Sequence, residues 1–542
     1  MKSFIIAKHS DLTIPERQKY SGSDYLYREF GSYFLAGEKH PQDEPLIIED
    51  EKYFVVVIGR ALPLKNFEKV FQVKHAELSW SDTARTVLKW FDELNGIVAF
   101  LIFNKKALKL RIVTDPMGFY PCMIWQCGQD LIFSDQLQYL LGHRRSELKW
   151  NEESLDLFYL NGHFISGQSW YQNLSRSLPA TVIEADLTDH TLKTWQYWGW
   201  NENSNIELSN NELVIGYIQE FTDFFHQLPD QFKAWGVALS GGLDSRWVLY
   251  EIKERFKTAG AFSFGEEDTI DLKVASEVCL KLGVPWKKYQ INHKNWIQNR
   301  LERIWLTGGL LSIQHFHEDD IYNDLNNDYE IIATGFYGGG VYSDAYTAGK
   351  TINPLIARQW FHFGKADDLT HLPYFKTSSI DPYISTQRIA NSGALHMHYL
   401  GKQLKTCLPF CNMRWLRYNY AVQDKIQLYH RLYLNAINRR WPLSIRNIPW
   451  QKTMLPVSWS LFNQWMLKTR FYKLQDNYFQ WTGRSKTFVD YHFLINEIKE
   501  CLVDLSPGWQ PPHKPRSTED YFRWLTIALW IEMNRQNKFN VL

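Results

Sequence analysis

The sequence has few cysteines, no long apolar run and almost no net charge. Six cysteines in 542 residues are too few for a disulfide scaffold, and the opening residues MKSFIIAKHS lack an apolar core of signal-peptide length. We therefore expect a protein of a reducing compartment, the cytoplasm. The longest apolar run, Ile97 to Phe103, falls far short of the roughly 20 residues that cross a bilayer. With 60 Lys+Arg against 59 Asp+Glu, the composition favours neither nucleic acid nor a membrane as a partner.

The composition that remains is that of an ordinary globular protein. Hydrophobic residues make up 45% and charged residues 22%, which excludes disordered, collagenous and coiled-coil chains. Aromatic residues reach 16%, with 23 Trp, a content that suits deep cores and stacking surfaces. At roughly 150 residues per domain the length predicts three or four domains, and two large domains are equally compatible with it.

The first half of the chain has the pattern of a sheet-rich domain. Short apolar runs separated by turn residues predict five strands. These runs are Phe54–Ile58, Ile97–Phe103, Leu108–Val113, Cys122–Trp125 and Leu131–Phe133. We expect two of the turns at Asn95-Gly96 and at Asp115-Pro116-Met117-Gly118.

From Glu207 onward, short strands alternate with amphipathic helices, which predicts a parallel α/β sheet. Gly283 follows an amphipathic helix at the place where a left-handed cap belongs. Beyond Ile380 the chain is predicted to be mostly helical. The expected strands are Ala234–Leu239, Ala259–Phe264 and Tyr329–Ala333, and the first expected helix is Arg246–Phe256.

A glycine-rich turn, Ser240-Gly241-Gly242-Leu243-Asp244-Ser245, connects the first of these strands to its helix. Such a loop directs backbone N–H groups toward an anion, and the helix dipole adds to the attraction. Gly241 and Gly242 let the backbone approach oxygen atoms closely. Asp244 can bind phosphate only through a bridging cation, for which Mg²⁺ is the natural choice. The alternative is a tight turn with Ser245 as the helix N-cap.

The hexapeptide resembles the pyrophosphate-binding motif of the ATP pyrophosphatase superfamily, specifically the synthetase domain of class B asparagine synthetases. Two further regions are similar to this domain. The first is the strand that ends in Phe262-Ser263-Phe264-Gly265, together with Asp271; in the family, backbone in this part contacts adenine. The second is the C-terminal helical part. The second region contains Leu408-Pro409-Phe410 and Ile448-Pro449-Trp450-Gln451-Lys452, where a lysine of the family contacts pyrophosphate. Three segments of the first half resemble the glutaminase-type domain of the family: Leu94-Asn95-Gly96, Asp115-Pro116-Met117-Gly118 and Phe133-Ser134.

The resemblance implies a two-part architecture of α/β and α+β class. Residues 1–205 would form a degenerate glutamine amidotransferase-like domain, an Ntn-hydrolase-like sandwich. Residues 206–542 would form an asparagine synthetase-like ATP-binding domain with an adenine-nucleotide α-hydrolase-like parallel sheet and a helical part from about residue 380. A homodimer is compatible with the sequence, which does not fix the oligomeric state.

The resemblance also implies a reaction. In the family, ATP adenylates a carboxylate, Mg²⁺ stabilises the departing pyrophosphate, and an amine attacks the acyl-adenylate to form an amide. ATP and Mg²⁺ are therefore the expected cofactors, and a small-molecule or peptide carboxylate and an amine the expected substrates. Asp244 and Lys452 would be catalytic, and Asp244 and Asp344 would be metal ligands. The expected ATP-binding residues are Leu239, Ser240, Gly241, Gly242, Leu243, Asp244, Ser245, Ser263, Phe264, Gly265 and Gly335.

Two features depart from the family pattern. A glutaminase of this type exposes a cysteine after removal of the initiator methionine, whereas position 2 here is Lys. A lysine ammonium cannot replace a thiolate nucleophile, so we expect no glutamine hydrolysis and an amine from another source. The second departure is the segment from Gly335 to Asp344, where the family usually has acidic residues and this chain has Phe336-Tyr337-Gly338-Gly339-Gly340. Asp344 is a candidate displaced ligand; alternatively, the loop is only a backbone cradle or the site is impaired.

Several alternatives stay open at this point. Asparagine-type synthesis competes with amidation or cyclisation of a specialised substrate, as in β-lactam synthetases and lasso-peptide cyclases, and the absent cysteine favours the second kind. A non-catalytic nucleotide-binding scaffold is the alternative from another class.

Three weaker motifs are interpreted as structural. Gly349-Lys350-Thr351 ends like a Walker A loop but lacks its first glycine. The segment with His315, His317, Glu318, Asp319 and Asp320 is interpreted as a solvated acidic loop rather than a metal site. Cys407 and Cys411 are expected to be buried thiols.

Overall fold

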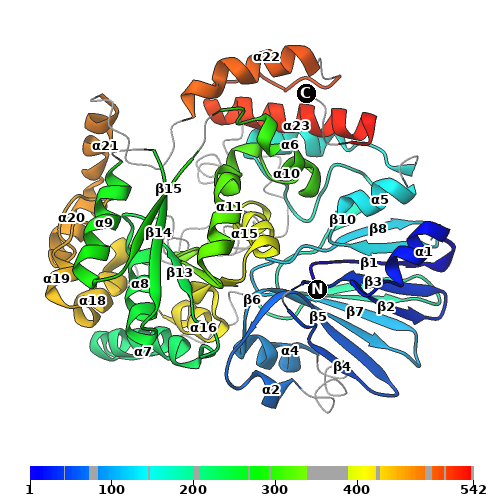
Figure 1. Cartoon of the computed structure of the whole chain (residues 1–542), viewed down its shortest axis with the longest axis horizontal. Helices are drawn as coiled ribbons and strands as arrows, with labels where there is room; N and C mark the ends of the chain where they lie inside the picture. The colour runs from blue at the N-terminus through cyan, green and yellow to red at the C-terminus, as the bar shows by residue number, and fades with distance from the viewer. Residues whose placement is uncertain are drawn as a thin grey trace.

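A computed structural model describes most of the chain (Figure 1). The described residues are 1–11, 13–41, 43–71, 83–144, 147–199, 207–266, 269–291, 294–338, 388–422, 428–481, 491–505 and 508–538. Within them, no helix combines the length and the apolar character that crossing a membrane requires.

The first half forms two antiparallel six-stranded sheets that lie against each other, with α1 and α5 outside one sheet and α2 and α4 outside the other (Figure 1). In order across the first sheet, the strands are β10 (Leu174–Arg176), β8 (Met123–Cys127), β9 (Asp130–Ser134), β1 (Ser3–Lys8), β3 (Tyr33–Glu38) and β2 (Tyr25–Phe30). Across the second they are β12 (Leu192–Gln196), β11 (Thr181–Asp186), β7 (Lys109–Thr114), β6 (Leu94–Asn104), β5 (Tyr53–Pro63) and β4 (Ile47–Glu49). The helices are α1 (Ile14–Tyr20), α2 (Phe67–Val70), α4 (Thr83–Asp92), α5 (Leu137–Arg144) and α6 (Glu152–Asn161). The predicted sandwich and all five predicted strands are confirmed.

One of the two predicted turns is wrong. The Asp115–Gly118 turn is present and is closed by the Gly118 N–H, which donates to the Asp115 carbonyl (3.1 Å). Asn95 and Gly96, however, lie inside β6, paired with Leu62 and Ala61 of β5. The buried Asn95 side chain accepts from the Leu408 N–H (2.8 Å) and donates to the Leu408 carbonyl (3.0 Å), so this residue joins the two halves of the chain instead of turning it.

The second half is built on a parallel five-stranded sheet, as predicted. Its order is β15 (Trp286–Gln290), β14 (Ala259–Gly265), β13 (Trp235–Ala238), β16 (Ile331–Thr334) and β17 (Thr406–Cys407). Helix α7 (Asn210–Gln227) precedes the first strand of this sheet. The helices between strands β13 and β16 are α8 (Leu243–Arg255), α9 (Ile270–Leu282), α10 (Leu301–Leu306) and α11 (Tyr322–Asp328). Gly283 caps α9 in the left-handed conformation (φ 65°), as its position in the sequence predicts. The proposed division at residue 205 stays a prediction.

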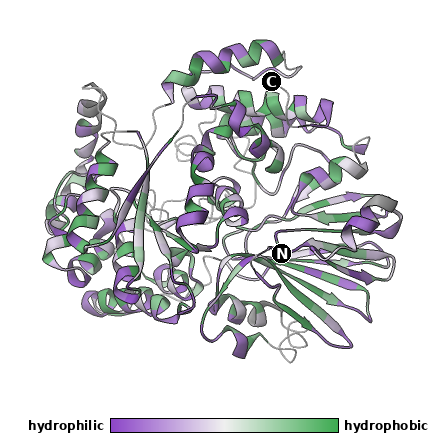
Figure 2. Ribbon diagram, viewed as in Figure 1, coloured by the Kyte–Doolittle hydropathy of each residue, from purple (hydrophilic) through white to green (hydrophobic). Residues whose placement is uncertain are grey.

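The described residues from 388 onward are mostly helical. They form α15 (Gly393–Gln403), α16 (Met413–Ala421), α18 (Arg431–Arg440), α19 (Leu443–Arg446), α20 (Ser460–Thr469), α21 (Tyr472–Trp481), α22 (Ile495–Leu505) and α23 (Thr518–Gln536). Figure 2 shows the apolar residues concentrated in the strands and on the inner helix faces.

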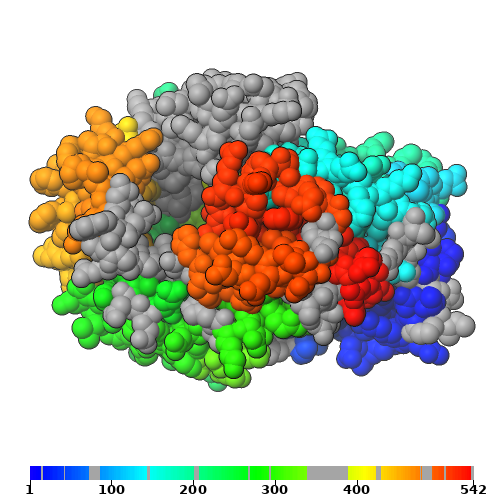
Figure 3. All heavy atoms as spheres, turned by 90° about the horizontal axis from the view of Figure 1, so that it is seen from above, coloured from blue at the N-terminus to red at the C-terminus, as the bar shows by residue number. Residues whose placement is uncertain are grey.

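The last helix ties the two halves together. Tyr171 donates to the Asn534 side chain (2.7 Å), and Arg523 donates to the Leu160 carbonyl (2.9 Å). Trp530 is fully buried in a cluster that contains residues of both halves. In Figure 3 the orange and red C-terminal helices accordingly lie between the green part of the chain and its cyan and blue part.

Candidate nucleotide site

The glycine-rich turn lies at the carboxyl edge of the parallel sheet, between β13 and α8, and borders a pocket of about 240 Å³. Open α/β sheets bind ligands at this edge. Eight of the predicted ATP-binding residues line the pocket: Leu239, Ser240, Gly242, Asp244, Ser245, Ser263, Phe264 and Gly335. The other lining residues are Ala238, Asp271, Leu272 and Thr334. The predicted residues Gly241, Leu243 and Gly265 do not line the pocket.

The start of α8 has the arrangement of an anion site. Gly242 is the N-cap and no side chain caps the helix, so the backbone N–H groups of its first turn have no side-chain acceptor. Ser245 is the third helical residue, and its Oγ accepts from the Ser240 N–H (3.1 Å) across the loop. The interpretation of Ser245 as the N-cap is therefore wrong: its hydroxyl closes the loop and leaves the helix end open.

Gly241 lies where no side chain fits. An added Cβ would be 2.8 Å from Asp271 Oδ1 and 2.9 Å from the Gln451 Cβ. Its N–H donates to Asp271 Oδ1 (2.8 Å), which ties the loop to the first turn of α9. Burial raises the pKa of Asp271 to about 6, against the opposing effect of that N–H. The sequence connects Asp271 to this site only through the family resemblance, because an acid in a first helical turn is common for electrostatic reasons alone.

Ser263 and Phe264, at the end of β14, form a second wall. The Ser263 hydroxyl donates to the Leu239 carbonyl (2.7 Å) and accepts from the Trp286 indole (2.9 Å), so it fixes the spacing of β13 and β14 at the pocket. The half-buried Phe264 ring borders the pocket and offers an apolar face against which a purine could stack.

The third wall follows β16 and is made of backbone. A Cβ on Gly335 would lie 2.5 Å from the Ser245 backbone nitrogen, so any side chain there would cover the open helix end. A Cβ on Gly338 would lie 2.5 Å from the Asp244 Cγ. Gly338 therefore packs directly on the carboxylate where the family resemblance leads one to expect further acids. Asp344, Gly339 and Gly340 lie outside the described residues.

Asp244 is held by a residue that the sequence did not reveal. The hydroxyl of Tyr433, on α18, donates to Asp244 Oδ1 (2.7 Å). Burial and the neighbouring carboxylate raise the pKa of Tyr433 well above its usual range, so it stays a donor at neutral pH. The two residues are 189 positions apart, and no local pattern marks the pairing.

Magnesium fits the oxygen donors of this site. Asp244 and Asp271 are carboxylates on the pocket wall, and Mg²⁺ is usually held by one or two carboxylates together with phosphate oxygens and water. Over the described ranges, no group of three or more His, Cys, Asp and Glu side chains forms a metal site by itself. Asp244 would hold the ion, with the nucleotide completing its coordination.

Arg246 binds the C-terminal turn to the glycine-rich loop. Its fully buried guanidinium donates to the carbonyls of Gly241 (3.3 Å), Ile448 (3.2 Å) and Pro449 (2.9 Å). Burial lowers the pKa of Arg246 to about 10, which leaves it charged at neutral pH. The Gln451 N–H adds a bond to the Gly241 carbonyl (3.3 Å). The turn that carries the predicted lysine therefore abuts the motif.

Lys452 itself does not line the pocket. Its ammonium lies over the rings of Trp450 (5.7 Å) and Tyr472 (5.4 Å). The structure brings its backbone to the loop, and its proposed contact with pyrophosphate stays a prediction.

The acidic segment near residue 318 is not a solvated loop. Glu318, with a side chain only 13% exposed, lies between His317 (3.1 Å) and His396 (3.3 Å). Burial opposes its charged form, yet the two imidazoles hold the pKa of Glu318 well below its usual range. Asp319 and Asp320 pair with arginines, at 2.9 Å to Arg303 and 2.8 Å to Arg300. The expectation failed because the partners come from outside the segment: Arg300 directly precedes α10, Arg303 is on α10, and His396 is on α15.

Cys407 is buried, as predicted, and Cys411 is partly buried. Burial raises the pKa of both thiols well above the usual range.

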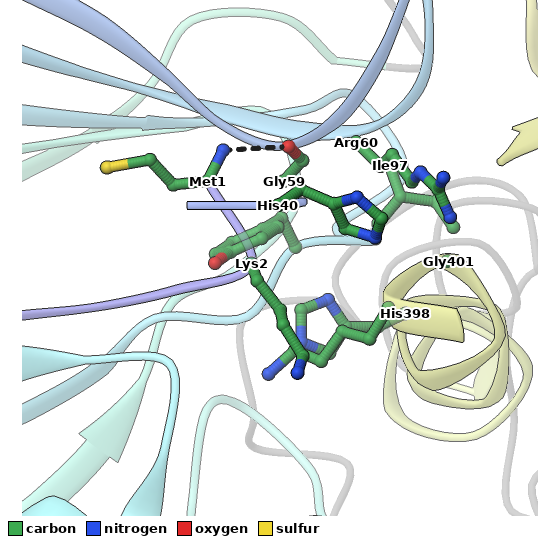
Figure 4. Close-up of a pocket in the computed structure, with 10 residues that line it drawn as sticks. Met1, Lys2, His40, Gly59, Arg60, Ile97, His398 and Gly401 are labelled. Atoms are coloured by element: carbon green, nitrogen blue, oxygen red, sulfur yellow. Dashed lines mark hydrogen bonds between the residues drawn. The ribbon is translucent and has the colours of Figure 1, made fainter. Parts of the chain in front are cut away.

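The region where the resemblance places a glutaminase nucleophile is nearly filled (Figure 4). A pocket of about 10 Å³ is lined by Met1, Lys2, His40, Gly59, Arg60, Ile97, Tyr120, His398, Gly401 and Lys402. None of these described residues is a cysteine. The Met1 ammonium donates to the Gly59 carbonyl (3.2 Å), and Lys2 extends toward His398 on α15.

Comparisons with known proteins found a matching family model and curated relatives. Residues 36–198 match the family described as "Glutamine amidotransferase domain". Asparagine synthetase [glutamine-hydrolyzing] 2 of Bacillus subtilis (strain 168) is 23% identical over 354 residues, which cover 59% of this chain and 46% of that protein. Putative asparagine synthetase [glutamine-hydrolyzing] 2 of Methanocaldococcus jannaschii is 24% identical over 216 residues, which cover 39% of this chain and 41% of that protein.

The chain thus spans less than half the length of these two curated relatives. Among solved structures, one titled as the allosteric regulatory enzyme of purine biosynthesis overlaps 54% of this chain and 60% of its own, with 10% identity and a TM-score of 0.23. The chain is thus similar to asparagine synthetases, and residues 36–198 match a domain of the glutamine amidotransferase type.

Proposed function

We propose that this protein is an ATP-dependent amide-forming ligase that adenylates a carboxylate, releases pyrophosphate, and transfers the acyl group from AMP to an amine. The observation that carries the proposal is the pocket at the Ser240–Ser245 loop, with an open helix end on one side and Phe264 on another. The sequence relatives, asparagine synthetases by name, support the same reaction class.

The residues of the pocket would divide the work between orientation and charge. The first-turn N–H groups of α8 and the hydroxyl of Ser240 would bind phosphate oxygens, and Phe264 would stack on the base. Asp244, oriented by the Tyr433 hydroxyl, would hold Mg²⁺, which neutralises charge on the polyphosphate when bound. Lys452 would reach the departing pyrophosphate by turning away from its aromatic neighbours.

The amine would come from outside the first domain. Lys2 occupies the position of the nucleophile, and the nearest cysteine in sequence, Cys122, is fully buried with its pKa raised well above the usual range by burial. We therefore propose that ammonia, or an amine on the substrate, attacks the adenylate. This favours amidation or cyclisation of a specialised carboxylate over glutamine-dependent asparagine biosynthesis.

All six cysteines are free thiols, which suits a reducing compartment such as the cytoplasm.

A non-catalytic nucleotide-binding scaffold is the second candidate. It is favoured by Gly338, which packs beside Asp244 and has no side chain, whereas the family pattern has acidic residues in this segment. A scaffold would bind ATP without turning it over, so the two candidates differ in product formation.

The proposed reaction is tested by its products. With Mg²⁺, ammonia or an amine, and a panel of carboxylates, labelled ATP should yield AMP and pyrophosphate, because the open helix end binds the group that leaves. Thin-layer separation of the labelled nucleotides measures this. ADP and phosphate as the only products would contradict adenylation, and ATP binding without any product in the presence of every carboxylate would favour the scaffold.

A second prediction concerns Asp244. The Asp244→Asn variant keeps the shape of the side chain but removes the charge that anchors Mg²⁺, so turnover should fall on the order of 100-fold or more while the far-ultraviolet circular dichroism stays unchanged. Chelation of Mg²⁺ in the unaltered protein should have the same effect. Asp223→Asn on α7 removes an exposed carboxylate and serves as the matched control, with activity expected near the starting value. Full activity of Asp244→Asn would remove this residue from the site.

A third prediction is that glutamine is not hydrolysed. Among the described residues, no thiol lines the pocket around Met1 and Lys2, so glutamate release should equal the buffer blank in the presence and absence of ATP. A coupled glutamate dehydrogenase assay measures it. Any release above the blank would contradict the prediction, and alkylation of accessible thiols would then show whether a cysteine or a different nucleophile is responsible.

A further inference from the structure

The segment around α20 and α21 exposes an unusual number of large apolar side chains. Six of the fifteen exposed large hydrophobic residues in the described part of the chain lie between Trp459 and Leu474. They are Trp459 (53% exposed), Leu461 (78%), Phe462 (62%), Trp465 (50%), Phe471 (48%) and Leu474 (58%), and we name these six residues the aromatic patch.

The patch contains two ring pairs and lies beside a helix face that is already buried. The rings of Trp459 and Phe462 are 5.9 Å apart, and those of Trp465 and Phe471 are 5.7 Å apart. Met466 and Leu467 of α20 are buried against the rest of the protein, so the exposed residues of the patch are additional to the face that α20 packs on the core. A group of exposed apolar side chains of this kind marks an interaction site.

The stretch of sequence that contains the patch carries formal charges of one sign. Residues 428–475 contain no Asp or Glu, although the whole chain has a net charge of only +1. The same residues include eight cations: Arg431, Arg439, Arg440, Arg446, Lys452, Lys468, Arg470 and Lys473. Of these, Lys468, Arg470 and Lys473 are exposed and alternate with the aromatic patch. The surface therefore matches a partner that is both anionic and apolar.

A bilayer with anionic lipids meets both requirements. Trp side chains favour the headgroup level, Phe and Leu enter the acyl boundary, and each Lys or Arg near the surface gains attraction from anionic headgroups. A second copy docked through the same patch would place like charges against one another. Nucleic acid would stack on the rings but would leave Leu461 and Leu474 without an apolar partner.

We propose that the aromatic patch docks this protein on the surface of an anionic membrane. The two helices lie at the left edge of Figure 1, on the side of the molecule opposite the N-terminal sheets, so docking leaves those sheets clear of the bilayer. This local surface differs from the expectation of no membrane partner, which rests on the averaged charge of the chain. The inference is independent of the proposed ligase activity.

Vesicle flotation of the full chain tests this inference. Vesicles of phosphatidylcholine mixed with an equal part of phosphatidylglycerol should carry the protein to the top of the gradient at low salt, and vesicles of phosphatidylcholine alone should not. The variant with Lys468→Glu and Lys473→Glu should bind on the order of tenfold more weakly or worse, since each cation contributes about 1 kcal/mol near such a surface. The variant with Leu461→Ser and Phe462→Ser should lose binding at unchanged charge.

A matched pair of exposed apolar residues elsewhere provides the control. Leu280→Ser with Val503→Ser alters side chains that are 78% and 74% exposed on α9 and α22, and its flotation should equal that of the unaltered chain. The proposal is wrong if the patch variants float as well as this control. It is equally wrong if no vesicle binds the protein. Self-association or binding of single-stranded RNA through the patch residues, without vesicle binding, would also contradict it.

Discussion

The candidate site depends on one buried cation. Arg246 has no exposed surface, and its guanidinium holds the carbonyls of Gly241, Ile448 and Pro449 together. Because a buried charge is costly unless it is hydrogen-bonded, these three carbonyls and the side chain fix one another. The first turn of α8, the glycine-rich loop and the C-terminal turn are thus positioned by a single group, although the loop and the C-terminal turn are about 200 residues apart.

The pocket that results is formed largely by backbone. A Cβ added at Gly241, Gly335 or Gly338 would lie within 3 Å of a neighbouring atom, so the lack of side chains there lets the loops after β13 and β16 pack closely against Asp271 and the first turn of α8. Among the described residues, two carboxylates line this space, and one of them, Asp244, is oriented by Tyr433. The arrangement suits a polyphosphate with its own cation better than an isolated metal ion.

Much of the fold could be predicted because it is local. The strands of the sandwich, the βα units and the Gly283 cap depend on neighbouring residues, and each follows from apolar period and turn chemistry. Asn95-Gly96 has the composition of a turn, yet the pairing of β6 with β5 and the bonds to Leu408 override that preference. Tyr433 and His396 escaped prediction because their partners, Asp244 and Glu318, are distant in sequence. Ser245 is not the cap that its position predicts, because its hydroxyl accepts from the Ser240 N–H, a bond that depends on the conformation of the loop. Charge averaged over 542 residues likewise concealed a local basic and aromatic surface.

We propose that the Ser240–Ser245 loop and the turn at Lys452 together enclose the polyphosphate of a bound nucleotide. Hydrogen–deuterium exchange of the full chain, with and without Mg²⁺ and a non-hydrolysable ATP analogue, tests it most directly. With the analogue bound, exchange should be slower than in the free protein in peptides that cover residues 240–246 and 449–453, and it should be unchanged in the aromatic patch. If saturating analogue slows exchange elsewhere in the chain but leaves exchange in both segments unchanged, the proposal is contradicted.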